Sequence, residues 1–189
     1  TANGMDILEC SGGLLAHVIP QSVMSPEMFG AYGDGTHDDV ASINRALQVC
    51  KHIVFGAKTY LITTQINVPA SGYIIEGASA SMQSDASIIR SNNDINMFYF
   101  TNANGCQLKN LQIYGNGSDD FGNVGGCGIR LPNNSYYFIA DNVTIRNIEY
   151  GVHVTSGWNV TLNNVLCYYV NKSFYFSNCT DIFMKHCIA

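Results

Sequence analysis

"GVHVTSGWNVTLNN", residues Gly151–Asn164, contains two short runs in which apolar and polar residues alternate, joined by a polar turn. The same arrangement returns 22 positions later as "SFYFSNCTDIFMKH", residues Ser173–His186. Earlier copies of the two runs are "MFYF" with "NLQIYG" and "GIRL" with "NVTIRN". Alternation with a period of two is typical of a strand with one buried face, so each copy predicts two short strands.

The first apolar positions of the four copies, Phe98, Ile129, Val152 and Phe174, are 31, 23 and 22 residues apart. The longest interval contains the glycine-rich segment 115–128, which we interpret as a loop inserted into a repeat of about 22 residues. One repeat cannot bury its own apolar side chains, whereas stacked repeats share a continuous core. The repeat therefore predicts a parallel β-solenoid. The alternative is an antiparallel sandwich or barrel, which would need hairpin turns that occur at few of the required places.

The composition favours β-structure and excludes several classes of partner. The 189 residues include 18 Gly, 11 Tyr and only 12% charged residues, with a net charge of −5 and scattered basic residues. We therefore expect no binding to nucleic acid or to an anionic membrane. No apolar run approaches the roughly 18 residues of a membrane span. The seven cysteines match no metal-ligand spacing and are expected to be buried thiols, so we predict no metal and no cofactor.

The stretch "FGAYGDGTHDDVASINRALQVC", residues Phe29–Cys50, stands apart from the repeat. Segment 36–39 fits an N-capping box, and the glycines of "GDG" suit positive φ angles. Val40, Ile43, Leu47 and Cys50 follow at helical spacing and form one apolar stripe. The stretch predicts a helix at about 37–50 that covers the open end of the solenoid, with regular coils from about 53. Its three aspartates are assigned to capping rather than to a cation site.

The segment 25–79 carries a family resemblance in "PEMFGAYGDGTHDDVASINRAL", "IVFGAKTYLIT" and "YIIEGAS". It resembles the start of the pectate-lyase-like right-handed β-helix of bacteriophage tailspikes and capsule depolymerases. The resemblance implies an all-β right-handed parallel β-helix with a short N-terminal capping helix. It also implies a homotrimer on the virion tail, attached to other tail or baseplate proteins. Such a protein folds in the bacterial cytoplasm and acts outside the cell on capsular polysaccharide or lipopolysaccharide O-antigen.

In domain terms, we expect a connecting segment at 1–25 and the β-helix at 26–189, truncated at its C-terminal end. The function predicted from the resemblance is polysaccharide depolymerisation by cleavage of glycosidic bonds. The alternative is a non-catalytic, trimeric receptor-binding or structural segment of the same fold. A secreted plant-polymer lyase is disfavoured by the odd number of cysteines.

Because alternate strand residues point outward, equivalent polar positions of the repeat should form columns along the solenoid. We expect one outward column of Tyr99, Arg130, His153 and Tyr175, and a second of Tyr114, Arg146, Asn163 and Lys185. Aromatic rings and forked donors suit sugars and their carboxylates. The predicted substrate-binding residues are Tyr99, Arg130, His153, Tyr175, Arg146 and Trp158, the last placed in a turn beside the second column.

Glycoside hydrolysis ordinarily needs two carboxylates, about 5–5.5 Å or 6.5–9.5 Å apart. We predict Asp120 and Glu149 as acid and base, with Asp119 and Asp141 as substitutes. A lyase acting on a uronic acid would instead need a base and a positive charge, for which Arg130, His153 and Arg146 are candidates. Hydrolysis is preferred over elimination, because the acidic residues show no Ca²⁺-binding cluster.

Overall fold

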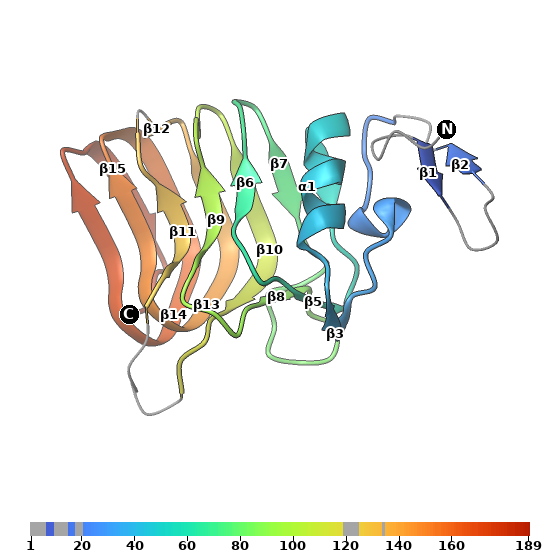
Figure 1. The fold of residues 1–189 in the computed structure, drawn as a ribbon. Coiled ribbons are helices and arrows are strands. Elements are labelled where there is room, and N and C mark those ends of the chain that lie inside the picture. The colour runs from blue at the N-terminus through green and yellow to red at the C-terminus, as the bar shows by residue number, and fades with distance from the viewer. Residues whose placement is uncertain (1–6, 10–14, 18–20, 119–124, 134) are drawn as a thin grey trace.

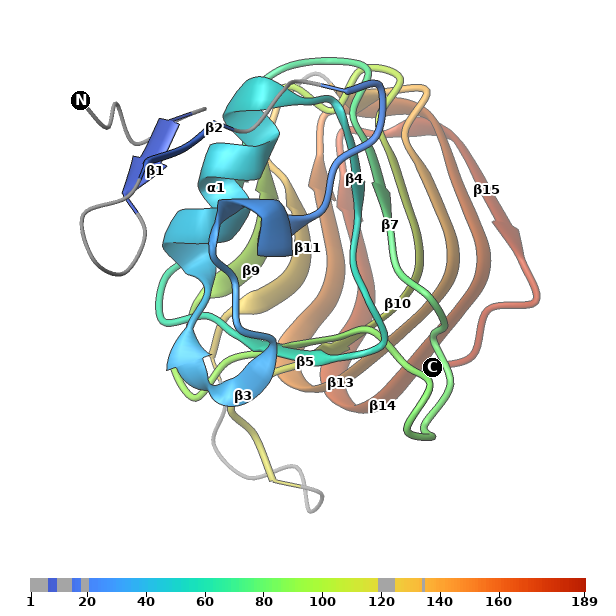
Figure 2. The same cartoon turned by 90° about the vertical axis from the view of Figure 1, so that its right-hand side faces the viewer.

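In the computed structural model, the described residues are 7–9, 15–17, 21–118, 125–133 and 135–189. The first two strands, β1 (Ile7–Glu9) and β2 (Leu15–His17), form a separate antiparallel pair. A 3₁₀ turn (η2, Pro26–Phe29) and one α-helix (α1, Val40–Val49) follow. Thirteen strands, the first of which lies between η2 and α1, build one sheet that curls around a common interior (Figures 1 and 2). No helix of this described part is long and apolar enough to cross a membrane.

All strand pairs of the large sheet are parallel, which excludes the antiparallel sandwich or barrel. Its strands are β3 (Asp34–Asp38), β4 (His52–Val54), β5 (Thr59–Leu61), β6 (Ile66–Val68), β7 (Ile74–Glu76), β8 (Ile88–Arg90), β9 (Asn96–Phe100), β10 (Gln107–Tyr114), β11 (Cys127–Leu131), β12 (Ser135–Tyr136), β13 (Ile139–Thr155), β14 (Gly157–Ser177) and β15 (Thr180–Lys185).

The predicted repeat is confirmed by the register of the last three strands, β13, β14 and β15. Ile139 of β13 pairs with Thr161 of β14, 22 positions later, and Thr161 pairs with Phe183 of β15, again 22 positions later. β10 and β13 pair in the same way across the longer interval, from Gln107 to Ile139. The chain therefore returns onto itself once per repeat, and equivalent residues lie side by side.

The interior is a stack of apolar side chains contributed at equivalent positions. Ile66, Phe98, Ile129 and Val152 are in register on β6, β9, β11 and β13, and all four are fully buried. Parallel strands of one sheet lie about 4.8 Å apart, so such residues contact each other directly. Burial of a large apolar side chain contributes roughly 1.5–3 kcal/mol, which makes these stacks the main source of stability.

Asparagines in the left-handed conformation mark the bends between the straight parts of each coil. Asn110, Asn142 and Asn164 have φ between 51° and 56° and occupy one position of successive coils. Asn164 donates a side-chain hydrogen bond of 2.9 Å to Asn142, which donates one of 2.9 Å to Asn110. Left-handed residues bend a strand, and asparagine tolerates this conformation better than most residues. These hydrogen bonds hold successive bends in line.

The helix α1 covers the N-terminal end of the curled sheet, as the apolar stripe predicts (Figure 1). Val40, Ile43 and Leu47 are buried, and the Leu47 carbonyl accepts a hydrogen bond of 2.8 Å from the Tyr73 hydroxyl. The helix is shorter than the expected 37–50 because segment 34–38 is strand β3, paired with β5.

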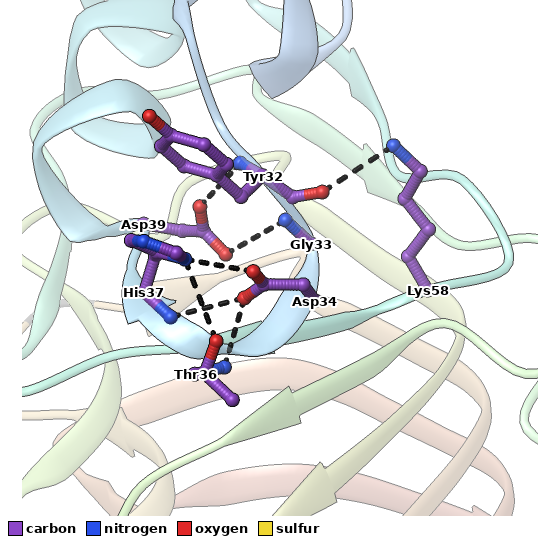
Figure 3. Close-up of polar contacts among 7 residues, drawn as sticks. All are labelled: Tyr32, Gly33, Asp34, Thr36, His37, Asp39 and Lys58. Carbon is purple, nitrogen blue, oxygen red and sulfur yellow. Dashed lines mark hydrogen bonds and ion pairs between the residues drawn. The ribbon is translucent and has the colours of Figure 1, made fainter.

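The predicted capping box is wrong (Figure 3). Asp39 is the N-cap residue, but its side chain makes no capping hydrogen bond to the helix. Its carboxylate instead accepts the amides of Tyr32 and Gly33, at 2.6 and 3.1 Å, and so closes the preceding turn. Asp38 takes over part of the capping role, since it accepts the Val40 amide at 3.2 Å. The expected positive φ of the "GDG" glycines is confirmed.

Candidate functional site

The first predicted column is confirmed by the strand register. Asn67, Tyr99, Arg130, His153 and Tyr175 pair in this order across β6, β9, β11, β13 and β14, and we call these five residues the His153 column. The neighbouring Val152 and Val154 are fully buried, so His153 lies on the outer side of the sheet. At about 4.8 Å per strand, the column extends over roughly 19 Å.

Aromatic rings pack together at the C-terminal end of the His153 column. The His153 ring stacks on Tyr150, with centroids 5.0 Å apart, and meets Tyr175 edge-on at 4.8 Å. Tyr175 remains 44% exposed, so part of its ring faces solvent. Packed rings of this kind hold each other in a fixed orientation, which lowers the entropy cost of presenting a ring to a ligand.

Arg130 is fixed against the outer surface of the sheet. Its Nη1 donates to the carbonyl oxygens of Leu131 and His153, at 3.1 and 3.2 Å, and to the Thr155 hydroxyl at 3.1 Å. Burial, followed by the charges of Arg130 and Lys172, lowers the pKa of His153. The imidazole is therefore neutral at neutral pH and can accept a proton.

Glu149 lies beside the column in a network with Lys172. Its two carboxylate oxygens accept hydrogen bonds from Asn171 at 2.7 Å and from Lys172 Nζ at 3.1 Å. The hydrogen bond from Asn171 has the larger effect and that from Lys172 the smaller one, and both lower the pKa of Glu149. Lys172 also donates to the Tyr150 hydroxyl at 2.9 Å. A carboxylate with a lowered pKa is ionised at neutral pH and suits a general base better than a general acid.

Tyr150 and Lys172 were not predicted from the sequence, although the repeat contained the necessary signal. The two residues are 22 positions apart and pair across β13 and β14. They follow Glu149 and Asn171, which are also 22 positions apart. Two adjacent polar positions at the repeat distance must lie side by side in stacked coils, so the whole network could have been predicted.

The second predicted column is wrong, because the structure divides it between two surfaces. Tyr114 does pair with Arg146, but Arg146 pairs next with Tyr168. Asn163 and Lys185 pair with each other and with Asp141 instead. The Arg146 guanidinium lies over the Tyr114 ring, 4.4 Å from its centroid. Neither Tyr114 nor Arg146 therefore shares a column with Asn163.

The remaining predicted residues do not gather at the His153 column. Asp119 and Asp120 lie outside the described residues, so the predicted pair of Asp120 and Glu149 stays a prediction. Asp141 accepts a hydrogen bond of 2.6 Å from Asn163, and the left-handed Asn142 and Asn147 separate it from Glu149 along β13. Asp141 and Glu149 thus lie on different surfaces of one coil.

Trp158 lies within β14 rather than in a turn, paired with Tyr136 of β12. Its ring is 43% exposed and tilts against Tyr137, with centroids 5.5 Å apart. The indole N–H donates to the Asp181 carboxylate at 2.5 Å. These contacts fix the ring at the bend through which the chain passes from β13 to the next coil.

Asp94 is a further carboxylate that the sequence analysis did not single out. It accepts the Gly125 amide at 3.1 Å and the Asn116 side chain at 3.3 Å. It lines a groove of about 510 Å³ together with Gln65 and Asn96. Across the described ranges, no three His, Cys, Asp or Glu side chains cluster in a way that would hold a metal ion.

No protein-family model matches the chain, and no curated protein matches it. Solved structures that share the fold include the following three. ORF18 of Geobacillus virus E2 is 17% identical, with a TM-score of 0.60 over 77% of this chain and 30% of its own. A putative glycosyl hydrolase from Parabacteroides merdae ATCC 43184 is 17% identical, with a TM-score of 0.58 over 87% of this chain and 84% of its own.

The third structure is the catalytic unit of the thermostable GH87 α-1,3-glucanase from Streptomyces thermodiastaticus strain HF3-3. It is 16% identical, with a TM-score of 0.55 over 90% of this chain and 41% of its own. The chain spans less than half the length of ORF18 and of the glucanase. At these identities, the similarity shows a shared fold.

Proposed function

We propose that the chain binds a bacterial surface polysaccharide along the His153 column. The observation that carries this proposal is the in-register column of aromatic, imidazole and guanidinium groups on the outer surface of the sheet. The rings of Tyr99, His153 and Tyr175 offer apolar faces to sugar rings, and Arg130 offers donors to hydroxyl or carboxylate groups. A column extended along successive coils suits a repeating polymer better than a small molecule.

We further propose that the chain is a right-handed parallel β-helix of a phage tailspike. The resemblance of segment 25–79, the parallel 22-residue register and the capping helix support this assignment. A viral protein, ORF18 of Geobacillus virus E2, has a similar fold. The tailspike would be a homotrimer on the virion, attached to other tail proteins, and its ligand would be capsular polysaccharide or O-antigen.

For the chemistry, hydrolysis of the bound polymer is the first candidate. Glu149 would act as the base, because its pKa is lowered and it lies next to the column. Asp120 would supply the acid, with Asp119 as its substitute, whereas Asp141 lies on another surface of the coil. Two structures with a similar fold are described as glycosyl hydrolases, which supports this class of reaction.

Elimination is the second candidate, and the state of His153 favours it. A lyase abstracts the proton α to a uronate carboxylate, and a neutral imidazole can accept that proton. Arg130, whose Nη1 donates a hydrogen bond of 3.2 Å to the backbone carbonyl of His153, would stabilise the negative charge of the enolate. A binding or structural role without catalysis is the third candidate, in which the column recognises the polymer and leaves it intact.

Incubation of the protein with purified capsule and O-antigen polysaccharides separates these candidates. Saturated oligosaccharides indicate hydrolysis, ultraviolet-absorbing unsaturated ends indicate elimination, and intact bound polymer indicates binding alone. We expect Tyr175→Ala to weaken polymer affinity by up to about tenfold, since an aromatic contact contributes roughly 0.5–1.5 kcal/mol. Tyr32→Ala, which removes an exposed ring at the N-terminal end, is the matched control. Equal affinities of Tyr175→Ala and the wild type would disprove binding along the column.

A further inference from the structure

A groove lies on another surface of the coil, over β13, β14 and β15. Its outward residues form two in-register rows, and its volume is about 660 Å³, within the usual range for sites that bind small ligands. We call it the Asp141 groove. The first row is Ile139, Thr161 and Phe183, and the second is Asp141, Asn163 and Lys185.

The side chains in the second row of the Asp141 groove can both donate and accept hydrogen bonds. Asn163 uses one N–H to bind Asp141, at 2.6 Å, which fixes the amide plane. Its second N–H and its carbonyl oxygen remain as donor and acceptor, by the chemistry of an amide. The Asp141 carboxylate accepts and the Lys185 ammonium donates. Sugar hydroxyls both donate and accept, so this row matches several hydroxyls on one ring.

The first row supplies the apolar contact that a sugar ring also needs. Phe183, on the outer side of β15, is 54% exposed. Ile139 lies two strands away in the same row, and the Thr161 hydroxyl stands between them. The apolar face of a pyranose can lie on the Phe183 ring while its hydroxyls reach the second row.

The charge of the Asp141 groove selects among saccharides. Asp141 and Lys185, the two formal charges in the rows, cancel, so the groove has no net positive charge that would favour a uronic acid over a neutral sugar. We propose that the Asp141 groove is a second saccharide site, which takes a neutral pyranose unit. This inference rests on the proposed function only for the class of ligand, because the groove shares no residue with the His153 column.

The single tryptophan provides a direct assay. Trp158 lies three residues before Thr161, at the bend that leads into the groove, so a bound sugar should change its fluorescence. The protein is titrated with neutral oligomers of glucose, galactose and N-acetylglucosamine and with oligogalacturonate, and the affinities are repeated by calorimetry. We expect at least one neutral oligomer to bind, at least fivefold more weakly in Phe183→Ala and in Asn163→Ala. Tyr32→Ala serves as the control without effect.

Several outcomes overturn the inference. The first is that no neutral oligomer binds, and the second is that only oligogalacturonate binds. The third is that Phe183→Ala and Asn163→Ala bind the neutral oligomers as tightly as the wild type does. A dimer that Phe183→Ala converts to a monomer would mean that a second copy occupies the groove. Unchanged melting temperatures show that the variants fold. The proposed function along the His153 column is tested by a different result. It would be wrong if Tyr175→Ala bound the polymer as tightly as the wild type.

Discussion

Gly151 provides a strong test of the stacked coils, because its Cα faces the backbone of the next coil. A Cβ atom at this position would lie 2.4 Å from the Ser173 carbonyl oxygen and 2.8 Å from Cys167 Sγ. An ordinary contact between carbon and a carbonyl oxygen is about 3.3 Å or longer, so the overlap approaches 1 Å. Gly151 has no positive φ, so Gly151→Ala adds this overlap without backbone strain.

We expect Gly151→Ala to cost about 3 kcal/mol of unfolding free energy, the upper end for overpacking, because a backbone carbonyl cannot rotate away. For a chain of this length, that cost lowers the melting temperature by roughly 6–12 °C. The assay is urea unfolding followed by circular dichroism, with thermal melts as a second measure.

Gly72→Ala is the control for the glycine substitution itself. Gly72 has φ +74° and open space around the Cβ position, so it loses only the left-handed preference, about 1 kcal/mol. If Gly151→Ala were as stable as the wild type, or no less stable than Gly72→Ala, residues 151 and 173 would not be stacked as described.

Three further predictions concern the cap, the bends and the pH dependence. Leu47→Ala, which opens a cavity beneath α1, should lower the unfolding free energy by about 2–4 kcal/mol in urea; an unchanged midpoint would mean that α1 does not cover the core. Asn142→Ala removes two side-chain hydrogen bonds and an asparagine that tolerates the left-handed conformation, so it should lower the unfolding free energy by roughly 2–4 kcal/mol. Asn142→Gly should be about 1 kcal/mol more stable than Asn142→Ala, because glycine adopts the left-handed conformation without strain. Equal stability of Asn142→Ala and the wild type would contradict the role of these hydrogen bonds. Because the pKa of His153 is lowered in the folded protein, the unfolded chain binds a proton at this residue at a higher pH than the folded chain does. The unfolding free energy should therefore fall as the pH drops below about 6.5, and His153→Gln should lose less stability over the same pH range. The same pH dependence of the melting temperature in both proteins would be evidence against a neutral imidazole in the folded state.

The sequence was sufficient for the parallel repeat, the apolar stripe of the cap helix and the His153 column. Each depends on a short-range period: two along a strand, 3.6 along a helix, and 22 between coils. His153 is a good example, since the buried Val152 and Val154 on either side fix its direction. A residue 22 positions away then has to be its neighbour.

The second column failed because two consecutive parts of each coil carry the same pattern. "NVTIRN" at 142–147 was aligned with "NVTLNN" at 159–164, but Val143 pairs with Val165. Both segments begin with a left-handed asparagine at a bend and continue with alternating residues. Local pattern alone cannot distinguish them, whereas the repeat distance of 22 could have done so.

The capping box failed for a different reason. The box at 36–39 placed the start of the helix at about 37, whereas the helix begins at Val40 and Asp39 is its N-cap residue. Two amides of the turn before the helix, those of Tyr32 and Gly33, compete for its carboxylate. The outcome depends on the path of the chain before the helix, which the residue types do not determine.

A polymer bound along the His153 column would contact residues that are distant in sequence. A double-mutant cycle on Tyr99 and Tyr175 measures this directly, by calorimetric titration with the best-binding polysaccharide of the capsule and O-antigen panel. We predict that each alanine substitution weakens binding by up to about tenfold and that the two losses add, since the residues lie roughly 14 Å apart. Absence of binding by every polysaccharide, or a loss at only one of the two positions, would contradict the account.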